Sequence, residues 1–274
     1  MGQARYPQRC AACPHGRRVI LGPDVAILCH YDRRGAIRTD TIRYLRELRA
    51  AGFSLVLVSN GGRLGPEAEA AIAELGGIAL RRRNFGQDFG AWRMALRVLD
   101  LPRPETGRIL LANDSVYGPL VPLAPLLARM TADGADLWGL TDSNERGWHL
   151  QSYFLLAHAS LLRAEVWRIF WRGARALPFK RWMVGRYEIG LSQRVAAAGF
   201  RAGALFPYAD IVPDAAIANP TLGAWQALLD AGFPFLKRAL LRDNPTRLSG
   251  LEAWRDRVSQ SCVMEIDADL NRSD

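Results

Sequence analysis

The polar loop at residues 83–92, RNFGQDFGAW, has the composition of a loop that binds phosphates or a nucleoside. Its glycines let the backbone approach a ligand closely, and it leads into a predicted helix whose first backbone amides have no partner within the helix. Asn84, Gly86 and Asp88 are therefore candidate ligands of a nucleoside and its phosphates. A simpler interpretation has Asp88 as the N-cap of that helix, and the two roles are compatible.

A second polar group, Asn113, Asp114 and Ser115, follows a predicted buried strand at residues 109–112. Ligands of open α/β sheets bind beyond the carboxyl ends of the strands, so these side chains lie where chemistry is expected. The Asp114 carboxylate could bind a divalent cation, Mg²⁺ or Mn²⁺, that bridges two phosphates. One carboxylate is a weaker ligand set than two, so we expect the cation at Asp114 without requiring it. A plain turn before Gly118 is the alternative.

The elements that position these groups follow an α/β pattern with a mixed, mainly parallel sheet. Short apolar runs alternate with helical patterns, which is typical of parallel strands joined by crossover helices; the runs are at residues 25–29, 55–58, 78–80 and 109–112. Further on, the sequence predicts strands at 137–139 and 153–156 and helices at about 160–171 and 187–198. We predict an N-terminal extension at 1–22, the α/β domain at 23–218 and a C-terminal helical appendage at 219–274.

Composition narrows the class of protein. The formal net charge of +9 comes almost wholly from arginine, because Lys180 and Lys237 are the only lysines. Arginine suits nucleoside diphosphates and lipid head groups as well as nucleic acid, so charge alone does not choose among them. The first strand is followed by no G-x-G-x-x-G motif, and there is no P-loop. No apolar run approaches the roughly 20 residues of a membrane span, and we expect a cytoplasmic protein.

The four cysteines do not predict a metal site or a disulfide framework. Cys10 and Cys13 form a C-x-x-C motif followed by His15, but no second C-x-x-C completes a tetrahedral zinc site. The role of this pair stays open. Cys29 lies in a predicted buried strand and Cys262 in the C-terminal part, which is consistent with a reducing compartment.

Several spaced sequence blocks resemble one known family. They are NFGQDFGAW (84–92), NDSVYGPL (113–120), WGLTDS (138–143), HLQSYF (149–154), YEIGLS (187–192), NPTLGAW (219–225) and PFLKRALLRDNP (234–245). In this order they resemble the rhamnan synthesis F family of bacterial polysaccharide glycosyltransferases. The resemblance implies a GT-A-like fold and transfer of a sugar, typically activated L-rhamnose, from a nucleotide-sugar donor to a polysaccharide or lipid-linked glycan acceptor. It places the reaction at the inner face of the cytoplasmic membrane and implies no nucleic-acid partner.

The block at 187–194 also resembles the E-D-x-x-L-x-x-R segment of inverting GT-A enzymes, in which an aspartate deprotonates the acceptor hydroxyl. Glu188 falls at that position, with one methylene group more, so the resemblance implies Glu188 as catalytic base. His149 and Gln151 are candidate acceptor-binding residues, because paired polar side chains can bind sugar hydroxyls. A first-turn glutamate that stabilises its helix and a satisfied core histidine are the simpler alternatives.

Two other functions stay open. Residues 48–60, LRAAGFSLVLVSN, resemble part of the haloacid-dehalogenase phosphatases, but His30 stands where their nucleophilic aspartate belongs. We expect His30 and His158 to be structural. Residues 167–182 interleave basic and aromatic side chains, which would suit a noncatalytic scaffold or an anionic membrane surface. A helix with its aromatics in the core and a solvated basic face is the alternative.

Overall fold

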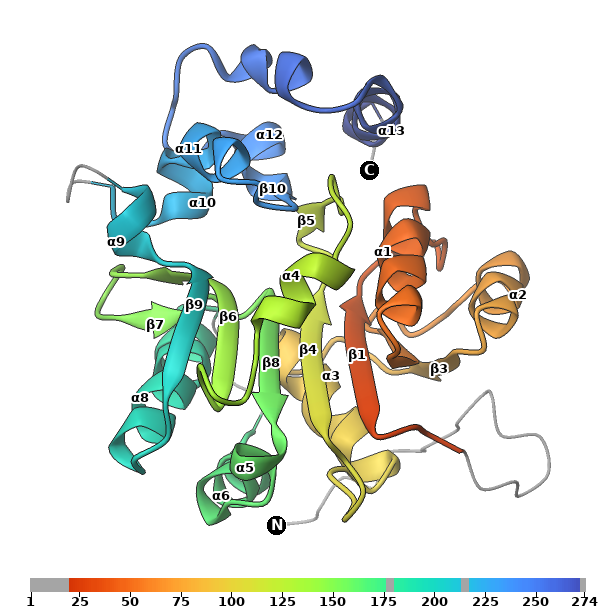
Figure 1. Cartoon of the computed structure of the whole chain (residues 1–274). Coiled ribbons are helices and arrows are strands. Elements are labelled where there is room, and N and C mark those ends of the chain that lie inside the picture. Colours follow the sequence, from red (N-terminus) through yellow and green to blue (C-terminus); the bar gives the residue numbers. More distant parts are fainter. Residues whose placement is uncertain (1–19, 176–179, 213–216, 272–274) are drawn as a thin grey trace.

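The computed structural model describes residues 20–175, 180–212 and 217–271. Its centre is a mixed eight-stranded sheet in the order β3-β2-β1-β4-β8-β6-β7, with β9 paired to β6 (Figure 1). The strands are β1 (Asp24–His30), β2 (Ser54–Ser59), β3 (Ile78–Arg81), β4 (Arg108–Asn113), β6 (Leu137–Ser143), β7 (His149–Leu150), β8 (Phe154–His158) and β9 (Ala202–Phe206). The predicted α/β class, with a mixed and mainly parallel sheet, is confirmed.

Four parallel strands, β3, β2, β1 and β4, are joined by three crossover helices. The helices are α1 (Thr39–Ala50), α2 (Pro66–Glu74) and α3 (Gln87–Val98). The strands are buried along almost their whole length, because helices cover both faces of the sheet. Each of the four strands predicted for this half lies inside an observed one.

The other half of the sheet is antiparallel around β8, which pairs with β4 on one side and β6 on the other. The carboxyl ends of β4 and β6 therefore meet the beginning of β8 at one edge. The helix predicted at about 160–171 is two helices, α5 (Ala159–Leu162) and α6 (Glu165–Gly173). The helix predicted at 187–198 begins earlier, with α7 (Lys180–Met183) and the π-helix η2 (Val184–Ile189), and continues as α8 (Gly190–Ala197).

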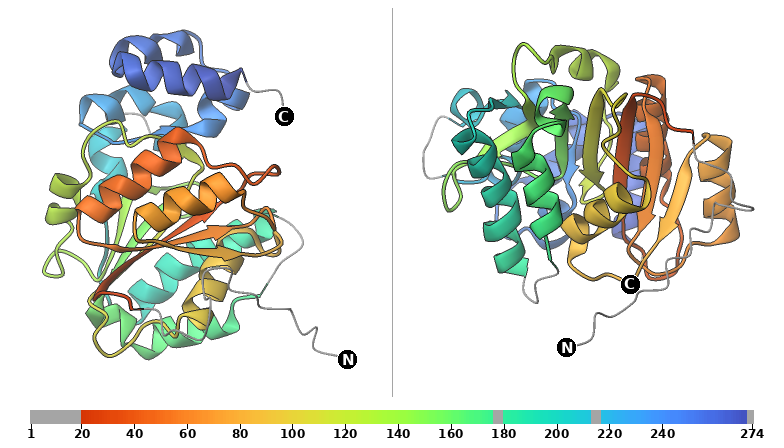
Figure 2. Two further views of the ribbon diagram at one scale, coloured as in Figure 1. Left: turned by 90° about the vertical axis from the view of Figure 1, so that its right-hand side faces the viewer. Right: turned by 90° about the horizontal axis from the view of Figure 1, so that it is seen from below.

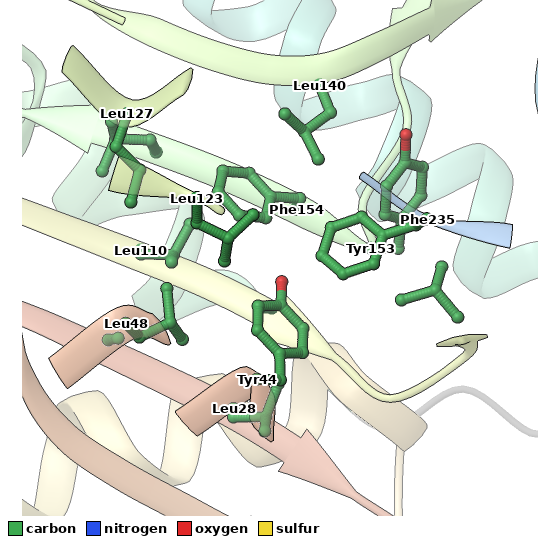
Figure 3. Packing of buried hydrophobic residues seen from close by; sticks show 14 of the residues in the cluster. Leu28, Tyr44, Leu48, Leu110, Leu123, Leu127, Leu140, Tyr153, Phe154 and Phe235 are labelled. Atoms are coloured by element: carbon green, nitrogen blue, oxygen red, sulfur yellow. The ribbon is translucent and has the colours of Figure 1, made fainter. Parts of the chain in front are cut away.

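Two apolar clusters cover the faces of the sheet, and the ribbon views of Figure 2 show helices on both of these faces. Helices α1, α2 and α4 (Ala124–Arg129) pack on one face, and α3, α5, α6 and α8 pack on the other. On the first face Tyr44 of α1 lies near Leu110, Phe154 and Phe235 (Figure 3). On the second face Trp92 of α3 is fully buried, and its indole nitrogen donates to the Ala112 carbonyl at 3.1 Å. The helices on both faces therefore fix the positions of the strand ends.

The C-terminal part lies over the carboxyl edge of the sheet (Figure 1). It consists of α10 (Pro220–Gly223), α11 (Trp225–Asp230), β10 (Leu236–Lys237), α12 (Arg238–Asp243), the 3-10 helix η3 (Leu251–Arg257) and α13 (Gln260–Leu270), and α9 (Tyr208–Ile211) precedes it. Strand β10 pairs antiparallel with β5 (Val116–Tyr117). A third apolar cluster joins Tyr117 to Trp225, Leu240 and Ile266. The predicted boundary between residues 218 and 219 stays a prediction, and these contacts cross it.

Candidate functional site

The carboxyl edge of the sheet brings two of the predicted site segments together. Asn113 ends β4, and its backbone amide donates to the Tyr153 carbonyl at 3.2 Å, just before β8 begins. On the other side of β4, the Asp114 amide donates to the Cys29 carbonyl of β1 at 3.1 Å. The antiparallel pairing of β8 thus places the segment at 151–153 beside the segment at 113–115.

Asp88, Asn113 and Ser115 form one hydrogen-bonded chain. The Asn113 amide nitrogen donates to Asp88 Oδ2 at 2.8 Å, and Asn113 Oδ1 accepts from the Ser115 amide at 3.1 Å and the Ser115 hydroxyl at 2.6 Å. Burial raises the pKa of Asp88, even though Cys29 and Asn113 donate hydrogen bonds to it. The structure therefore groups three of the six residues predicted to bind the nucleotide sugar.

The loop before α3 is held by its backbone. Gly86 is the N-cap of α3, with φ of 76° in the left-handed region that favours glycine, so the interpretation of Asp88 as N-cap is wrong. A Cβ atom at Gly90 would lie 2.2 Å from the Phe85 carbonyl oxygen, so only glycine permits the loop to fold back this closely. Asn84 is exposed on the loop and Phe85 is 58% exposed. Among the described residues, no hydrogen bond joins Asn84 to the Asp88 chain.

Asp114 faces away from that chain, into a cluster of cationic groups. Its Oδ2 atom lies 2.6 Å from Nδ1 of the buried His30 and accepts a hydrogen bond from the Arg38 guanidinium. The Arg238 guanidinium donates to the Asp114 carbonyl at 2.7 Å. Burial alone would raise the pKa of Asp114, but His30, Arg38 and Arg238 hold it well below its ordinary value. Asp114 is therefore a stable carboxylate.

This ion-pair network continues into the C-terminal part. Arg238 bridges Asp40, at the start of α1, and Asp269, in α13; its distance to Asp269 Oδ2 is 2.7 Å. Asp269 Oδ2 also accepts from the Tyr117 hydroxyl at 2.8 Å and from Arg242 at 2.8 Å. Burial raises the pKa of Asp40, whereas Asp269 has a lowered pKa because Tyr117 and its arginine neighbours outweigh burial. The network fixes α1, β4 and α13 relative to one another.

The surroundings of Asp114 do not fit a divalent cation. Among residues 20–175, 180–212 and 217–271, no group of three His, Cys, Asp or Glu side chains could hold a metal ion. The Oδ2 atom already accepts from His30 and Arg38, and a cation there would face two guanidinium groups. Asp88 Oδ2 already has Asn113 as its donor. Neither carboxylate matches the oxygen-rich and anionic ligand set that Mg²⁺ prefers.

His30 at the end of β1 bears on the phosphatase alternative. Its ring contacts Asp114 through Nδ1 and the Ala36 carbonyl, 2.8 Å away, through Nε2. Asp32 instead accepts hydrogen bonds from the Arg34 and Ala36 amides. A nucleophilic carboxylate at the end of the first strand is what that chemistry needs, so the phosphatase alternative gains no support.

Glu188 reaches the same edge from the second face of the sheet. It lies in the π-helix η2, and its Oε1 atom accepts from the Ser152 amide at 2.7 Å. The carboxylate is half-buried, while Leu191 and Val195 of α8 are buried in the core. π-Helical turns interrupt regular helices frequently at functional sites. Glu188 thus lies beside the beginning of β8 and contacts Ser152, the residue that precedes Tyr153.

His149 and Gln151, the two predicted acceptor-binding residues, are buried and form hydrogen bonds within the protein. His149 is 4% exposed, and its Nδ1 lies 2.9 Å from the Gly147 carbonyl. Gln151 is 5% exposed; its Oε1 accepts from the Thr141 hydroxyl at 2.6 Å and its Nε2 donates to Asn219 at 3.1 Å. Thr141 also contacts the Tyr153 hydroxyl at 2.6 Å. Gln151 therefore joins β6 to the start of α10, and its role in acceptor binding stays a prediction.

Lys237 lies at this edge and is one of four charged residues that the sequence did not predict as part of the site. Its Nζ atom lies 3.1 Å from the Ser115 hydroxyl and 4.5 Å from the centroid of the Tyr153 ring. Arg38, Arg238 and Asp269 were missed as well. A signal existed for two of them, because Lys237 and Arg238 interrupt the apolar run at residues 233–241, where a buried charge needs a partner.

Comparison with known proteins relates this geometry to one family. The model of the family described as rhamnan synthesis protein F matches residues 55–255. The virulence protein VirA of Vibrio anguillarum is 28% identical over 251 residues, which cover 81% of this chain and 80% of VirA.

Two solved structures follow a similar chain path. One is the glycosyltransferase GlyE of Streptococcus pneumoniae TIGR4, with a TM-score of 0.46, 11% identity and coverage of 91% of this chain and 63% of GlyE. The other is the mannosyltransferase PcManGT of Pyrobaculum calidifontis, in complex with GDP-Man and Mn²⁺, with a TM-score of 0.43, 11% identity and coverage of 94% and 83%. TM-scores below 0.5 are too low to transfer a site or a cofactor.

The family match is stronger evidence, because it extends over most of the sequence. It includes the Asp88 chain, Asp114, the segment at 149–153, Glu188 and Lys237. The chain therefore belongs to the rhamnan synthesis protein F family, the family of polysaccharide glycosyltransferases that its sequence blocks resemble.

Proposed function

We propose that this protein is an inverting glycosyltransferase that moves a sugar, L-rhamnose, from a nucleotide-sugar donor to a growing cell-surface polysaccharide or lipid-linked glycan. One observation carries the proposal: the half-buried Glu188 and the Asp88–Asn113–Ser115 chain share one edge of the sheet. Ser152 bonds to Glu188, and its neighbour Tyr153 lies beneath Lys237, which contacts Ser115. Membership of the rhamnan synthesis protein F family supports L-rhamnose as the transferred sugar.

In the proposed reaction Glu188 takes the proton of an acceptor hydroxyl while that oxygen attacks the anomeric carbon of the donor. The bond from this carbon to the diphosphate breaks on the opposite side, and its electron pair leaves on the diphosphate oxygen. Asp88, Asn113 and Ser115 position the donor, with Asn84 and Gly86 on the nucleoside side. A carboxylate is needed because a sugar hydroxyl is a poor nucleophile at neutral pH.

Thermal-shift screening is the first test of this function. The panel contains dTDP, UDP and GDP, their sugar conjugates and simple phosphomonoesters. A glycosyltransferase should be stabilised by one nucleoside diphosphate and its sugar, because a ligand that binds only the folded state raises the melting temperature. Release of that diphosphate in the presence of a glycan acceptor then measures transfer. A preference for phosphomonoesters would favour the phosphatase, and indifference to all nucleotides would favour a scaffold.

Attachment to the inner face of the cytoplasmic membrane belongs to the same proposal. Within the described ranges, no helix combines the length and apolar character that a membrane span needs. Helix α6 buries Trp167, Phe170 and Trp171 and exposes Arg168 and Arg172, so its aromatics belong to the core. Phe179 lies outside the described residues.

The support for attachment is accordingly electrostatic, from the exposed arginines, with Trp182 47% exposed nearby in the sequence. Co-sedimentation with anionic liposomes should therefore occur at low salt and decrease at high salt. Failure to bind at low salt would contradict it.

A further inference from the structure

Lys237 brings a positive charge to the Asp88–Asn113–Ser115 chain. We propose that Lys237, and not a divalent cation, meets the leaving diphosphate of the nucleotide sugar. This inference rests on the proposed glycosyltransferase function and goes beyond it, because it assigns the charge that stabilises the leaving group.

Strand β10 carries Lys237 to the edge of the sheet from far along the chain. Lys237 is the register partner of Val116 in the short antiparallel ladder with β5. The next residue fixes this position, since the Arg238 amide donates to the Ser115 carbonyl at 3.0 Å and the Arg238 side chain donates to the Asp114 carbonyl at 2.7 Å. The backbone of Lys237 is therefore held against residues 114–116.

The side chain of Lys237 points to the donor side of the edge. Its Nζ atom is 3.1 Å from the Ser115 hydroxyl, the same hydroxyl that bonds Asn113 Oδ1 in the chain to Asp88. It also lies 4.5 Å from the Tyr153 ring centroid, a cation–π contact that steadies the ammonium. Burial raises the pKa of the nearby Asp88, and the half-buried ammonium opposes part of that rise. A lysine in such a place is a compact charge of the kind that binds phosphate.

Asp114 and Asp88, the two carboxylates nearest to Ser115, already have other partners and do not form a metal site. Asp114 is engaged by His30 and Arg38, and Asp88 by Asn113. Bringing a divalent cation to Asp114 would break an ion pair and add charge next to Arg38 and Arg238. An ammonium supplied by β10 avoids both costs, because it is already part of the folded edge.

The chemical role follows from the balance of the reaction. When the bond between the anomeric carbon and the diphosphate oxygen breaks, the electron pair leaves with the diphosphate and its negative charge grows. Lys237 stabilises that charge from the side of Ser115. The proton of the acceptor hydroxyl goes to Glu188, so no other acid or base is required.

Isothermal titration of dTDP, UDP and GDP, and of the corresponding monophosphates, tests the inference in buffers with EDTA and with Mn²⁺. The variants are Lys237→Met, which keeps the stem without the charge, and Lys237→Arg, which keeps the charge. Arg168→Met on the exposed face of α6 is the control for loss of one basic residue. Thermal unfolding of each variant checks that it is folded.

We expect the wild type to bind one diphosphate equally well in EDTA and in Mn²⁺. Lys237→Met should weaken that diphosphate at least about 10-fold and the monophosphate much less, while Lys237→Arg and Arg168→Met stay within about threefold. Binding that needs Mn²⁺, or a Lys237→Met variant that is folded and binds like the wild type, overturns the inference and leaves the proposed function intact. A wild type that binds no nucleotide in either buffer overturns both.

Discussion

Two groups of side chains share the carboxyl edge of the sheet and differ in what they bond to. On one side Asp114 is paired with His30 and Arg38, and its pKa lies well below the ordinary value. On the other side Asp88 is paired with the neutral amide of Asn113, and burial raises its pKa. Both carboxylates are half-buried, so the partners, and not the depth, set the sign of the shift in pKa.

The Asp114 group stabilises the fold, whereas the Asp88 group belongs to the proposed reaction. The Asp114 side is a closed set of charges whose members neutralise one another, which is how a fold fixes distant segments. The Asp88 side, with Ser115, Lys237 and Glu188, contains the groups that contact the donor and the acceptor in the proposed function. We therefore expect substitutions on the first side to act on stability and those on the second to act on binding and rate.

The largest expected effect is on the reacting side. Glu188→Gln should lower kcat by about 10²–10⁴-fold, the usual contribution of a general base, while donor binding persists. The glutamine oxygen can still accept from the Ser152 amide, so the free energy of unfolding should change by less than about 1 kcal/mol. Steady-state transfer and donor titration measure the two effects. Glu165→Gln, in an exposed pair on α6, is the control.

An unchanged kcat would remove Glu188 from the mechanism. Loss of donor binding together with kcat would instead assign it to holding the donor, and the comparison would lose its reacting base.

The second effect is on the holding side. Asp114→Asn leaves the buried His30 without its carboxylate and leaves Arg38 with only Asp40 and Asp269, at 3.7 Å and 4.0 Å, which should lower the free energy of unfolding by about 3–5 kcal/mol. The change is nearly isosteric, so the expected loss comes from the missing charge in this network and not from a change of shape. Urea unfolding measures it. Asp24→Asn, which breaks the more exposed pair with Arg108, is the matched control and should cost at most about 1 kcal/mol.

Equal losses in the free energy of unfolding for Asp114→Asn and Asp24→Asn would show that the network around Asp114 contributes no more to stability than an exposed ion pair. Transfer activity of the Asp114 variant should be compared only where it is folded.

The third effect is the pH dependence of that loss. The folded pKa of Asp114 lies below its unfolded value of about 3.9, so its contribution is complete above that pH and disappears as the pH falls toward the folded pKa. The difference between the wild type and Asp114→Asn should therefore narrow below about pH 4, by at most about 1.4 kcal/mol per pH unit. Urea unfolding from about pH 6 to about pH 3 follows it. A difference that widens on acidification has the wrong sign.

The smallest expected effect separates the two carboxylates directly. Asp88→Asn keeps an oxygen that can accept from Asn113 and removes a charge that burial disfavours, so unfolding should change by no more than about 1 kcal/mol. Donor affinity should still fall, because the chain to Ser115 is altered. Parallel urea and nucleotide titrations of the Asp88 and Asp114 variants make the test. A loss of about 3 kcal/mol at Asp88 would merge the two sides into one structural network.

Much of the frame could be predicted because it rests on local patterns. The strands of the parallel half were found because their apolar runs are bounded by helical ones, and the positions of Asn113 and Asp114 followed from the rule for strand ends. No local pattern shows in which direction β8 runs. The strands at 137–139 and 153–156 were therefore predicted, but their antiparallel pairing was not. Glu188 was placed on a helix, but the π-helical turn depends on tertiary packing.

The partners of the site residues were beyond the reach of the sequence. A strand end fixes where Asp114 lies but not which way its side chain turns, and Arg238 and Asp269 lie over 100 residues further along the chain. Asp88 was taken for a cap because aspartate often serves as one, whereas Gly86 takes that position in the left-handed conformation. Ion pairs between segments that are distant in the chain produce no regular residue spacing in the sequence, so they could not be predicted from it.

The bridge that Arg238 makes between Asp40 and Asp269 has a consequence for biosynthesis. A ribosome delivers β1, α1 and β4 first, so Asp40 and Asp114 emerge well before the arginine of α12 and the aspartate of α13 that complete their surroundings. Until then these two aspartates lack Arg238, one of their cationic partners. The parallel strands can pair as soon as they have emerged, whereas the proposed site is complete only after the C-terminal part has docked over them.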